Sequence, residues 1–290
     1  MDDRITIRAF RPPDIPFGMM LKDIAGWNQL PADWERLIAL EPEGCFVAQY
    51  DGRDVGTVTV TAYEKRFGWV GMVLVHPGMR RKGVGTTLLR HGIRYLERKG
   101  VTAVKLDATP AGKQLYLTLG FADECLIERR QGVGEAVDSP ADPSIVSNRS
   151  ALSGVLDRLC EYDAPVFGAD RSRVLRRLVV EPGVQSGVAI DSRGAIQGYI
   201  MVRRGSNRYY IGPWVADNTD TGGALWRWAL SRTSGEPFFV DVCLANPEVD
   251  GIVPKERFPL QRRLIRMVRG ENRYTGEPRR VFGIAGPEMG

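Results

Sequence analysis

The sequence pattern of the first half of this 290-residue chain returns, loosely, in the second half about 140 residues later. Each half holds two short apolar segments around a turn, then a buried apolar run, then an apolar residue followed by Asp, and finally a Phe that precedes another strand. The matching landmarks are 47–56 and 188–198, Val75 and Val215, Asp107 and Asp241, and Phe121 and Phe258. The repeat predicts two domains of one fold, of which the second is diverged.

The order of the elements predicts an α/β fold. The first half alternates strand-like segments with amphipathic helices, among them an apolar strand at 69–75 and a helix at 86–99 that Gly100 stops. Residues 131–150 are rich in Gly, Pro, Ser and Asp, which is typical of a linker. We therefore expect a first domain at 1–132, a linker at 133–150 and a second domain at 151–290.

Composition argues against several classes of protein. Hydrophobic residues make up 43% of the chain and charged residues 26%, which fits a globular protein. The apolar runs are too short to cross a bilayer, and the acidic start MDDR does not resemble a signal peptide. These features predict a cytoplasmic protein that does not use a membrane.

The cysteines and histidines are too few and too scattered for a metal site. Four cysteines stand singly, without a CxxC pair, and the two histidines are His76 and His91. We expect thiols in a reducing compartment and no metal. The net charge of +5 comes from interspersed charges, so a nucleic-acid partner is not expected either.

The sharpest local signal is the segment RRKGVGT, from Arg80 to Thr86, which lies between the buried strand and the amphipathic helix. Glycines at a helix start leave several backbone N–H groups directed at one spot, where the helix dipole adds partial positive charge. Such a loop suits a pyrophosphate, with Arg81 and Lys82 adding charge beside it. The spacing matches neither the P-loop, because Lys82 precedes Gly83, nor the GxGxxG fingerprint, because Leu88 stands where a third glycine is needed.

Arg80-x-x-Gly83-x-Gly85 resembles the Q/R-x-x-G-x-G/A signature of the GNAT superfamily of N-acetyltransferases. Further along, Tyr116 to Phe121 resembles the Y-x-x-x-G-F motif of the same family, in the order that the family uses. The resemblance is clear over 5–130. The second half resembles the GNAT-like C-terminal domain of tandem acetyltransferases, so each domain is expected to be a mixed sheet flanked by helices.

The resemblance implies a site for acetyl-CoA between the fourth and fifth strands. Backbone groups of Val73, Leu74 and Val75 would pair with the pantetheine arm, as an added strand does. Tyr116 would protonate the departing thiolate. The pyrophosphate would lie on the loop and helix start, formed by Arg80, Arg81, Lys82, Gly83, Val84, Gly85 and Thr86.

The general base is the weak point of this resemblance. Many relatives carry a Glu on the fourth strand, and 69–75 has none. Asp107, at the end of the fifth strand, is the first candidate, either to accept a proton through water or to bind a cationic substrate; a strand-end cap is an equally good interpretation. Glu64 and Glu128 are weaker candidates. We expect His76 to shape the turn after the strand.

The second half lacks the cofactor loop. Val215 is followed by ADNTDTGG, which is acidic where a pyrophosphate needs positive charge, so no CoA is expected there.

The resemblance implies acetyl transfer from acetyl-CoA to an amine, and we expect a primary amine of a small molecule. A protein or peptide acceptor, and a non-catalytic module that binds or senses acyl-CoA, stay open as alternatives. A homodimer is the working expectation for the assembly.

Overall fold

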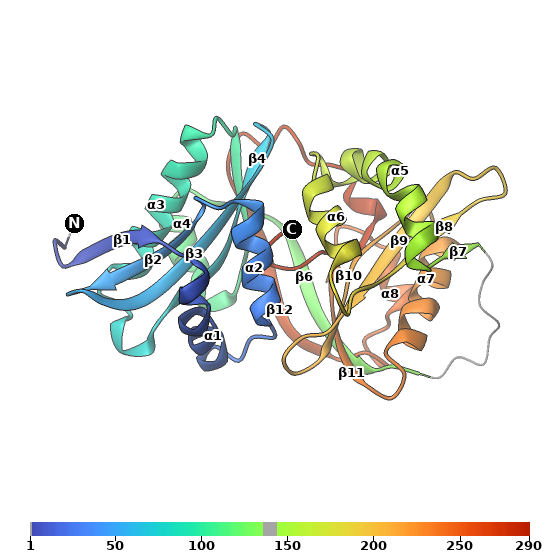
Figure 1. Ribbon diagram of the computed structural model, residues 1–290, viewed down its shortest axis with the longest axis horizontal. Helices are drawn as coiled ribbons and strands as arrows, with labels where there is room; N and C mark the ends of the chain where they lie inside the picture. Colours follow the sequence, from blue (N-terminus) through green and yellow to red (C-terminus); the bar gives the residue numbers. More distant parts are fainter. Residues whose placement is uncertain (1, 136–143) are drawn as a thin grey trace. The chain divides into compact units, whose positions relative to one another are not determined.

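The computed structural model describes residues 2–135 and 144–290, which form two compact units (Figure 1). Unit 1 consists of Met1–Asp123, Met267–Arg273 and Pro287–Gly290. Unit 2 consists of Glu124–Arg266 and Tyr274–Gly286. Each unit is a mixed sheet with helices, so the predicted α/β fold class is confirmed. The expected linker, 133–150, lies partly outside the described residues, because 136–143 are not described.

The sheet of unit 1 has the strand order β1-β2-β3-β4-β5-β12. Neighbours from β1 to β4 are antiparallel, and β4 and β5 are parallel. The strands are β1 Ile5–Ala9, β2 Cys45–Tyr50, β3 Arg53–Tyr63, β4 Phe67–Val75, β5 Ala103–Ala108 and β12 Leu260–Gly270. Of β12, the part from Met267 onward belongs to unit 1.

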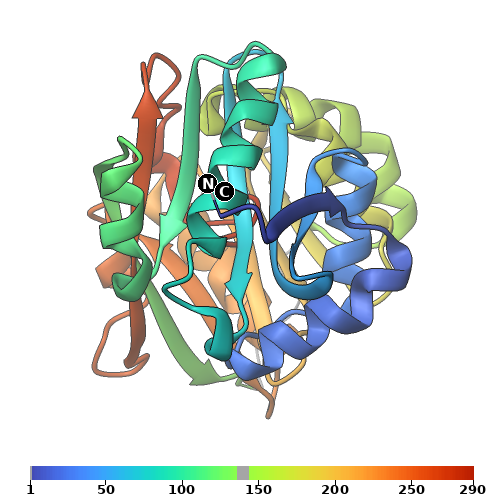
Figure 2. The ribbon, with the colours of Figure 1, turned by 90° about the vertical axis from the view of Figure 1, so that its left-hand side faces the viewer.

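Helices cover both faces of this sheet (Figure 2). They are α1 Ile15–Ile24, α2 Pro31–Leu40, α3 Val84–Arg98 and α4 Pro110–Thr118. Small residues let α3 approach closely: a Cβ on Gly92 would lie 2.9 Å from Val60, and one on Gly68 would lie 2.5 Å from Leu96. α3 therefore packs on the face that carries Val60 and Gly68.

The opposite face of β3 and β4 is fixed by their register. The pairs are Thr59↔Gly71, Thr61↔Trp69 and Tyr63↔Phe67, and residues directly opposite each other in an antiparallel pair point to the same side. We call these six residues the Trp69 face. Because side chains alternate along a strand, this face points away from α3.

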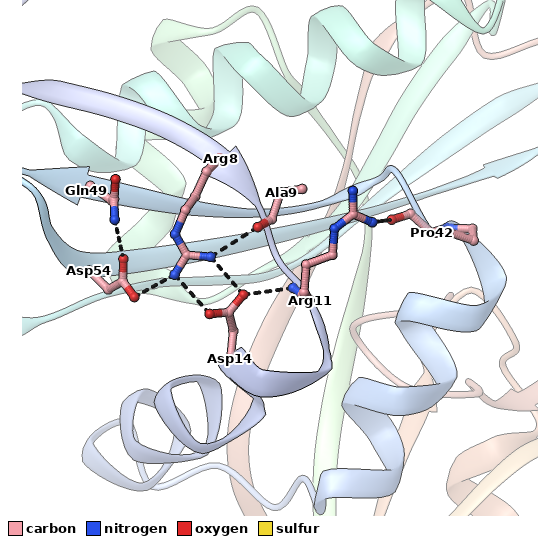
Figure 3. A network of polar contacts seen from close by, with 7 residues as sticks. All are labelled: Arg8, Ala9, Arg11, Asp14, Pro42, Gln49 and Asp54. Carbon is pink, nitrogen blue, oxygen red and sulfur yellow. Dashed lines mark hydrogen bonds and ion pairs between the residues drawn. The ribbon is translucent and has the colours of Figure 1, made fainter.

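An ion-pair network holds the start of α1 against the sheet (Figure 3). The Arg8 guanidinium on β1 contacts Asp14 at 2.8 Å and Asp54 at 2.6 Å. The Asp14 carboxylate also accepts a hydrogen bond from the Arg11 backbone N–H at 2.8 Å. Asp14 ends the short 3-10 helix η1, Pro12–Asp14, so the network fixes the turn from β1 into the helical region.

The sheet of unit 2 has the strand order β12-β6-β11-β13-β10-β9-β8-β7. The strands not yet given are β6 Ala122–Val133, β7 Ile145–Val146, β8 Gln185–Ile190, β9 Ile196–Arg203, β10 Tyr209–Ala216, β11 Pro237–Cys243 and β13 Val281–Gly283. The helices are α5 Arg149–Phe167, α6 Ser172–Val180, α7 Thr219–Arg232 and α8 Val249–Ile252, with the 3-10 helix η3 at Pro278–Arg280. Trp214 stacks on Trp226 at 5.1 Å in its core, and Trp228 is also buried.

Candidate active site

The strands β4 and β5 separate part of the way along their length. Their parallel pairing runs from Phe67↔Ala103 to Trp69↔Lys105 and ends there, although β4 continues to Val75 and β5 to Ala108. The register of β4 against β3 shifts between Thr57 and Thr59, which leaves an extra residue on β4, and Met72 in this bulge adopts φ 49°. We call the stretch beyond Trp69, where β4 and β5 are not paired, the gap; an extended ligand can pair with the backbone of β4 there.

The three residues predicted to line this gap alternate in burial. Leu74 is buried in the core, whereas Val73 and Val75 are half-buried. A Cβ placed on Gly85 would lie 3.5 Å from Leu115 and 3.7 Å from Val75, so the start of α3, the end of β4 and α4 converge at this point. The predicted strand and the predicted loop therefore lie together in unit 1.

The loop before α3 presents an uncapped helix start. Gly83 is the N-cap residue with φ 82°, and no side chain caps the helix there. Arg81 also adopts a left-handed conformation, with φ 62°. Residues of positive φ that alternate with residues of negative φ turn successive N–H groups toward one side of the chain. Together these groups form a small anion-binding concavity. The helix thus offers its first N–H groups and its positive end to a ligand.

Positive charge surrounds the start of α3. Arg80, Arg81 and Lys82 are exposed, and the Lys82 ammonium lies 5.2 Å from the centre of the Tyr50 ring. His76 has the structural role expected for it, because its Nδ1 accepts a hydrogen bond from the Gly78 N–H at 3.3 Å. Val84 is buried and Thr86 is half-buried. Neither is charged, so the charged side chains of this site come from the loop and add to the positive end of the helix.

Tyr116 lies on α4 in a desolvated position. Its ring packs over Gly112 one turn earlier, where an added Cβ would be 2.9 Å from the ring, and its centre is 6.0 Å from that of Phe121. Burial raises the pKa of the Tyr116 phenol to about 12. The hydroxyl is therefore protonated throughout the physiological range and can serve as a proton donor but not as a base.

The carboxylates proposed from the sequence have different surroundings. Asp107 is half-buried on β5, beyond the last pair that β5 forms with β4. Glu64 lies in the turn before β4, at the opposite end of that strand from the loop, and pairs with Arg66 at 3.1 Å. Glu128 belongs to unit 2, where Arg130, Lys255 and Arg263 contact its carboxylate. Although burial alone would raise the pKa of Glu128, its cationic partners lower it, which makes it a poor base.

The matching place in unit 2 is filled by the chain itself. β10 and β11 are parallel from Tyr209↔Phe238 to Ile211↔Val240. Beyond that point β13 pairs with both strands, through Trp214↔Gly283 and Val242↔Gly283. The helix that follows, α7, begins with its own cap, since Asn218 accepts a hydrogen bond from the Thr221 N–H at 2.9 Å, and Asp220 lies in its first turn.

A segment near the end of the sequence, 287–289, was not predicted to belong to unit 1. The Trp69 indole donates a hydrogen bond to the Pro287 carbonyl at 3.0 Å, and the Tyr63 hydroxyl donates to the Met289 carbonyl at 2.7 Å. Glu288, between them, is 4% exposed. The signal that could have indicated a close backbone approach is Gly71, a glycine inside an apolar strand.

Three further observations concern the described part of the chain. No helix there is long and apolar enough to cross a membrane. No group of three or more His, Cys, Asp or Glu side chains within it is arranged to hold a metal ion. All four cysteines are thiols rather than disulfides, as predicted.

Comparison with known proteins identifies the family in both halves of the chain. Residues 17–121 match the Acetyltransferase (GNAT) family, and residues 159–283 match an Acetyltransferase (GNAT) domain. The chain therefore belongs to the GNAT superfamily, in its tandem form, and is an acyltransferase of the GNAT type.

Similar proteins support the same assignment over the full length. The holothin acyltransferase of Pseudoalteromonas sp. (strain SANK 73390) is 27% identical over 269 residues, covering 91% of this chain and 87% of that protein. A Pyrococcus horikoshii protein described as a candidate acetyltransferase has a TM-score of 0.85 at 22% identity, with 100% and 97% of the two chains covered. A tandem GNAT protein from the clavulanic acid biosynthesis pathway has a TM-score of 0.65 at 15% identity, with 92% and 98% covered. The two structures support the fold alone.

Proposed function

We propose that this chain transfers an acetyl group from acetyl-CoA to a primary amine of a small molecule, by direct attack in a ternary complex. The observation that carries the proposal is the gap where the β4–β5 pairing ends at Trp69, next to an uncapped, positively charged helix start at Gly83. A strand-shaped gap suits the pantetheine arm, and the helix start suits the pyrophosphate.

The cofactor would bind in unit 1 only. Val73, Leu74 and Val75 would hold the pantetheine through their backbone groups, and the segment Arg80 to Thr86 would hold the phosphates. In unit 2 the corresponding gap holds β13, and Asn218 caps the helix. Both features support the proposal that the second domain, at 151–290, binds no CoA.

The chemistry would need a proton donor at the sulfur and a stabilised oxyanion at the carbonyl. The buried, protonated hydroxyl of Tyr116 would donate to the departing thiolate. Backbone N–H groups near the β4 bulge would stabilise the oxyanion. Asp107, half-buried beyond the last β4–β5 pair, would attract a cationic acceptor toward the gap.

The small-molecule acceptor is supported by the similarity to the holothin acyltransferase, which extends over most of both chains. Holothin belongs in the first panel of acceptors, beside simple primary amines. Transfer would be followed as release of the CoA thiol, with each acceptor in excess.

The four cysteine thiols support the expected cytoplasmic location.

The cofactor site is tested by calorimetric titration of acetyl-CoA into the whole chain and into two matched variants. Gly83→Leu and Gly100→Leu alter the two ends of α3, at residues with φ 82° and 81°, so both carry a similar strain of about 1–2 kcal/mol. We expect one site in the wild type and in Gly100→Leu, and loss of binding in Gly83→Leu. Equal affinity in both variants would refute the loop assignment, and no binding to the wild type would refute the proposed function.

A further inference from the structure

The segment 287–289 lies directly on the Trp69 face of β4. Besides the hydrogen bonds from Trp69 and Tyr63, a Cβ built on Gly71 would lie 2.7 Å from the Glu288 Cα and 2.9 Å from its Cβ. Only a glycine at this position of β4 lets the backbone of the segment approach so closely. The structure therefore puts Glu288 where a side chain of residue 71 would otherwise be.

Gly71 immediately precedes the bulged residue Met72, and Val73, two residues along, begins the edge proposed for the pantetheine. β4 itself carries no carboxylate. Glu288 thus supplies a carboxylate to a strand that lacks one, beside the part of the strand where the acyl group is expected. The Gln29 amide, in the chain between α1 and α2, donates to its Oε2 at 3.2 Å.

The surroundings of Glu288 are polar although they are buried. Thr59, the cross-strand partner of Gly71, and Thr61, the partner of Trp69, are each 1% exposed. Neither threonine hydroxyl finds a hydrogen-bond partner within the described chain. Buried hydroxyls are normally satisfied by protein or by ordered water. Two unsatisfied hydroxyls on the face that holds Glu288 indicate a place for water or for a polar substrate group.

Building on the proposed amine transfer, we propose that Glu288 is the general base, which takes the amine proton directly or through a water held on the Trp69 face. The amine nitrogen attacks the thioester carbonyl carbon, and its proton passes to the Glu288 carboxylate as the C–N bond forms. The C–S bond then breaks, and the sulfur takes the proton of Tyr116. Transfer of the proton from Glu288 to the phenolate through water restores both groups, so amine and thioester give amide and thiol.

The test compares two small amines of different basicity, propylamine and hydroxylamine, on the same enzyme preparation. Propylamine is almost entirely protonated at about pH 7, so its ammonium must lose one proton to water before the neutral nitrogen attacks and a second to the base as the C–N bond forms. Hydroxylamine is mostly neutral there, and its less basic nitrogen gives up its proton more readily without a base. E288Q keeps an oxygen that can accept the Gln29 hydrogen bond but removes the base. We expect E288Q to lower kcat/KM for propylamine by about 10²–10⁴-fold, and for hydroxylamine by less than about tenfold.

E41Q is the matched control. Glu41 is also a buried carboxylate of unit 1, 6% exposed, and it accepts hydrogen bonds from the Tyr95 hydroxyl on α3 at 2.6 Å and from the Ala62 backbone N–H at 3.1 Å. E41Q should leave the ratio of the two kcat/KM values as it is in the wild type. Because the ratio is taken within one preparation, partial loss of folded protein cancels.

The possible outcomes distinguish a failure of the Glu288 assignment from a failure of the proposed amine transfer. An E288Q enzyme that loses both activities equally, or neither, overturns the assignment of Glu288 while transfer by the wild type stands. A wild type that binds acetyl-CoA by calorimetry but releases no CoA thiol with either amine overturns the amine transfer, and the base with it.

Discussion

The position of Glu288 depends on one glycine, which makes Gly71→Ala the most informative single change. The added methyl would lie 2.7 Å from the Glu288 Cα and 2.9 Å from its carbonyl oxygen. Both are backbone atoms, so they cannot move aside as a flexible side chain could. We expect the segment 287–289 to be displaced from the Trp69 face.

The loss of stability follows from the contacts that displacement would break. The hydrogen bonds from Trp69 and Tyr63 to the segment are worth about 1 kcal/mol each. Met289, which is 0% exposed, would lose about 2 kcal/mol of burial. Complete detachment of the segment 287–289 therefore lowers the free energy of unfolding by about 4 kcal/mol, and a partial shift of the segment lowers it by less. Turnover of amines should fall as well, while acetyl-CoA affinity is retained.

Urea unfolding measures the loss of stability, and limited proteolysis near 287–290 measures the displacement, since a displaced segment becomes accessible. Gly154→Ala is the control, because a Cβ on Gly154 in α5 meets nothing within 4 Å. Gly71→Ala refutes the dependence of the segment on this glycine if the variant loses less than about 0.5 kcal/mol of unfolding free energy, the range of an ordinary surface substitution, and if residues 287–290 resist protease as in the wild type.

Two further changes probe the groups proposed at the gap. Tyr116→Phe should lower kcat by about 10²-fold or more with little change in acetyl-CoA affinity, because the phenol acts only on the departing thiolate; wild-type turnover would exclude it from the mechanism. Since the pKa of this acid is about 12, turnover should lose its contribution only as pH rises through that value, and a decline centred near neutral pH would have to come from another group. Asp107→Asn should raise KM for propylamine more than for hydroxylamine and change kcat little, because its charge is proposed to attract a cation; equal KM changes for the two amines would contradict that role.

Local patterns were enough to predict the elements around the candidate site. The strand expected at 69–75 is β4, Phe67–Val75, and the helix expected at 86–99 is α3, Val84–Arg98. A continuous apolar run, an amphipathic helix and a glycine at each helix end are features of consecutive residues, and they are readable without knowledge of the fold. The position of the loop between them is then predicted as well, because the strand and the helix that flank it are both predicted.

The non-local partners of the site could not be read in the same way. β13, Val281–Gly283, is too short for any periodicity, yet it fills the gap between β10 and β11. Residues 287–289 form no helix or strand, and their place on β4 depends on contacts with residues more than two hundred positions away, such as Tyr63 and Trp69. In the sequence, only Gly71 indicated that another backbone segment could approach β4 closely. A glycine inside a strand can equally mark a bulge or a tight bend.

The two gaps explain how one fold can serve different purposes in a single chain. A parallel pair that separates leaves backbone groups that must find partners, whether in protein, water or ligand. In unit 2 β13 supplies them, and the Asn218 cap satisfies the helix start beside it. In unit 1 the pairing of β4 with β5 ends at Trp69 and Gly83 leaves the helix start without a side-chain cap. The same separation is thus closed by the chain in one unit, and in the other it leaves the backbone groups that a cofactor can satisfy.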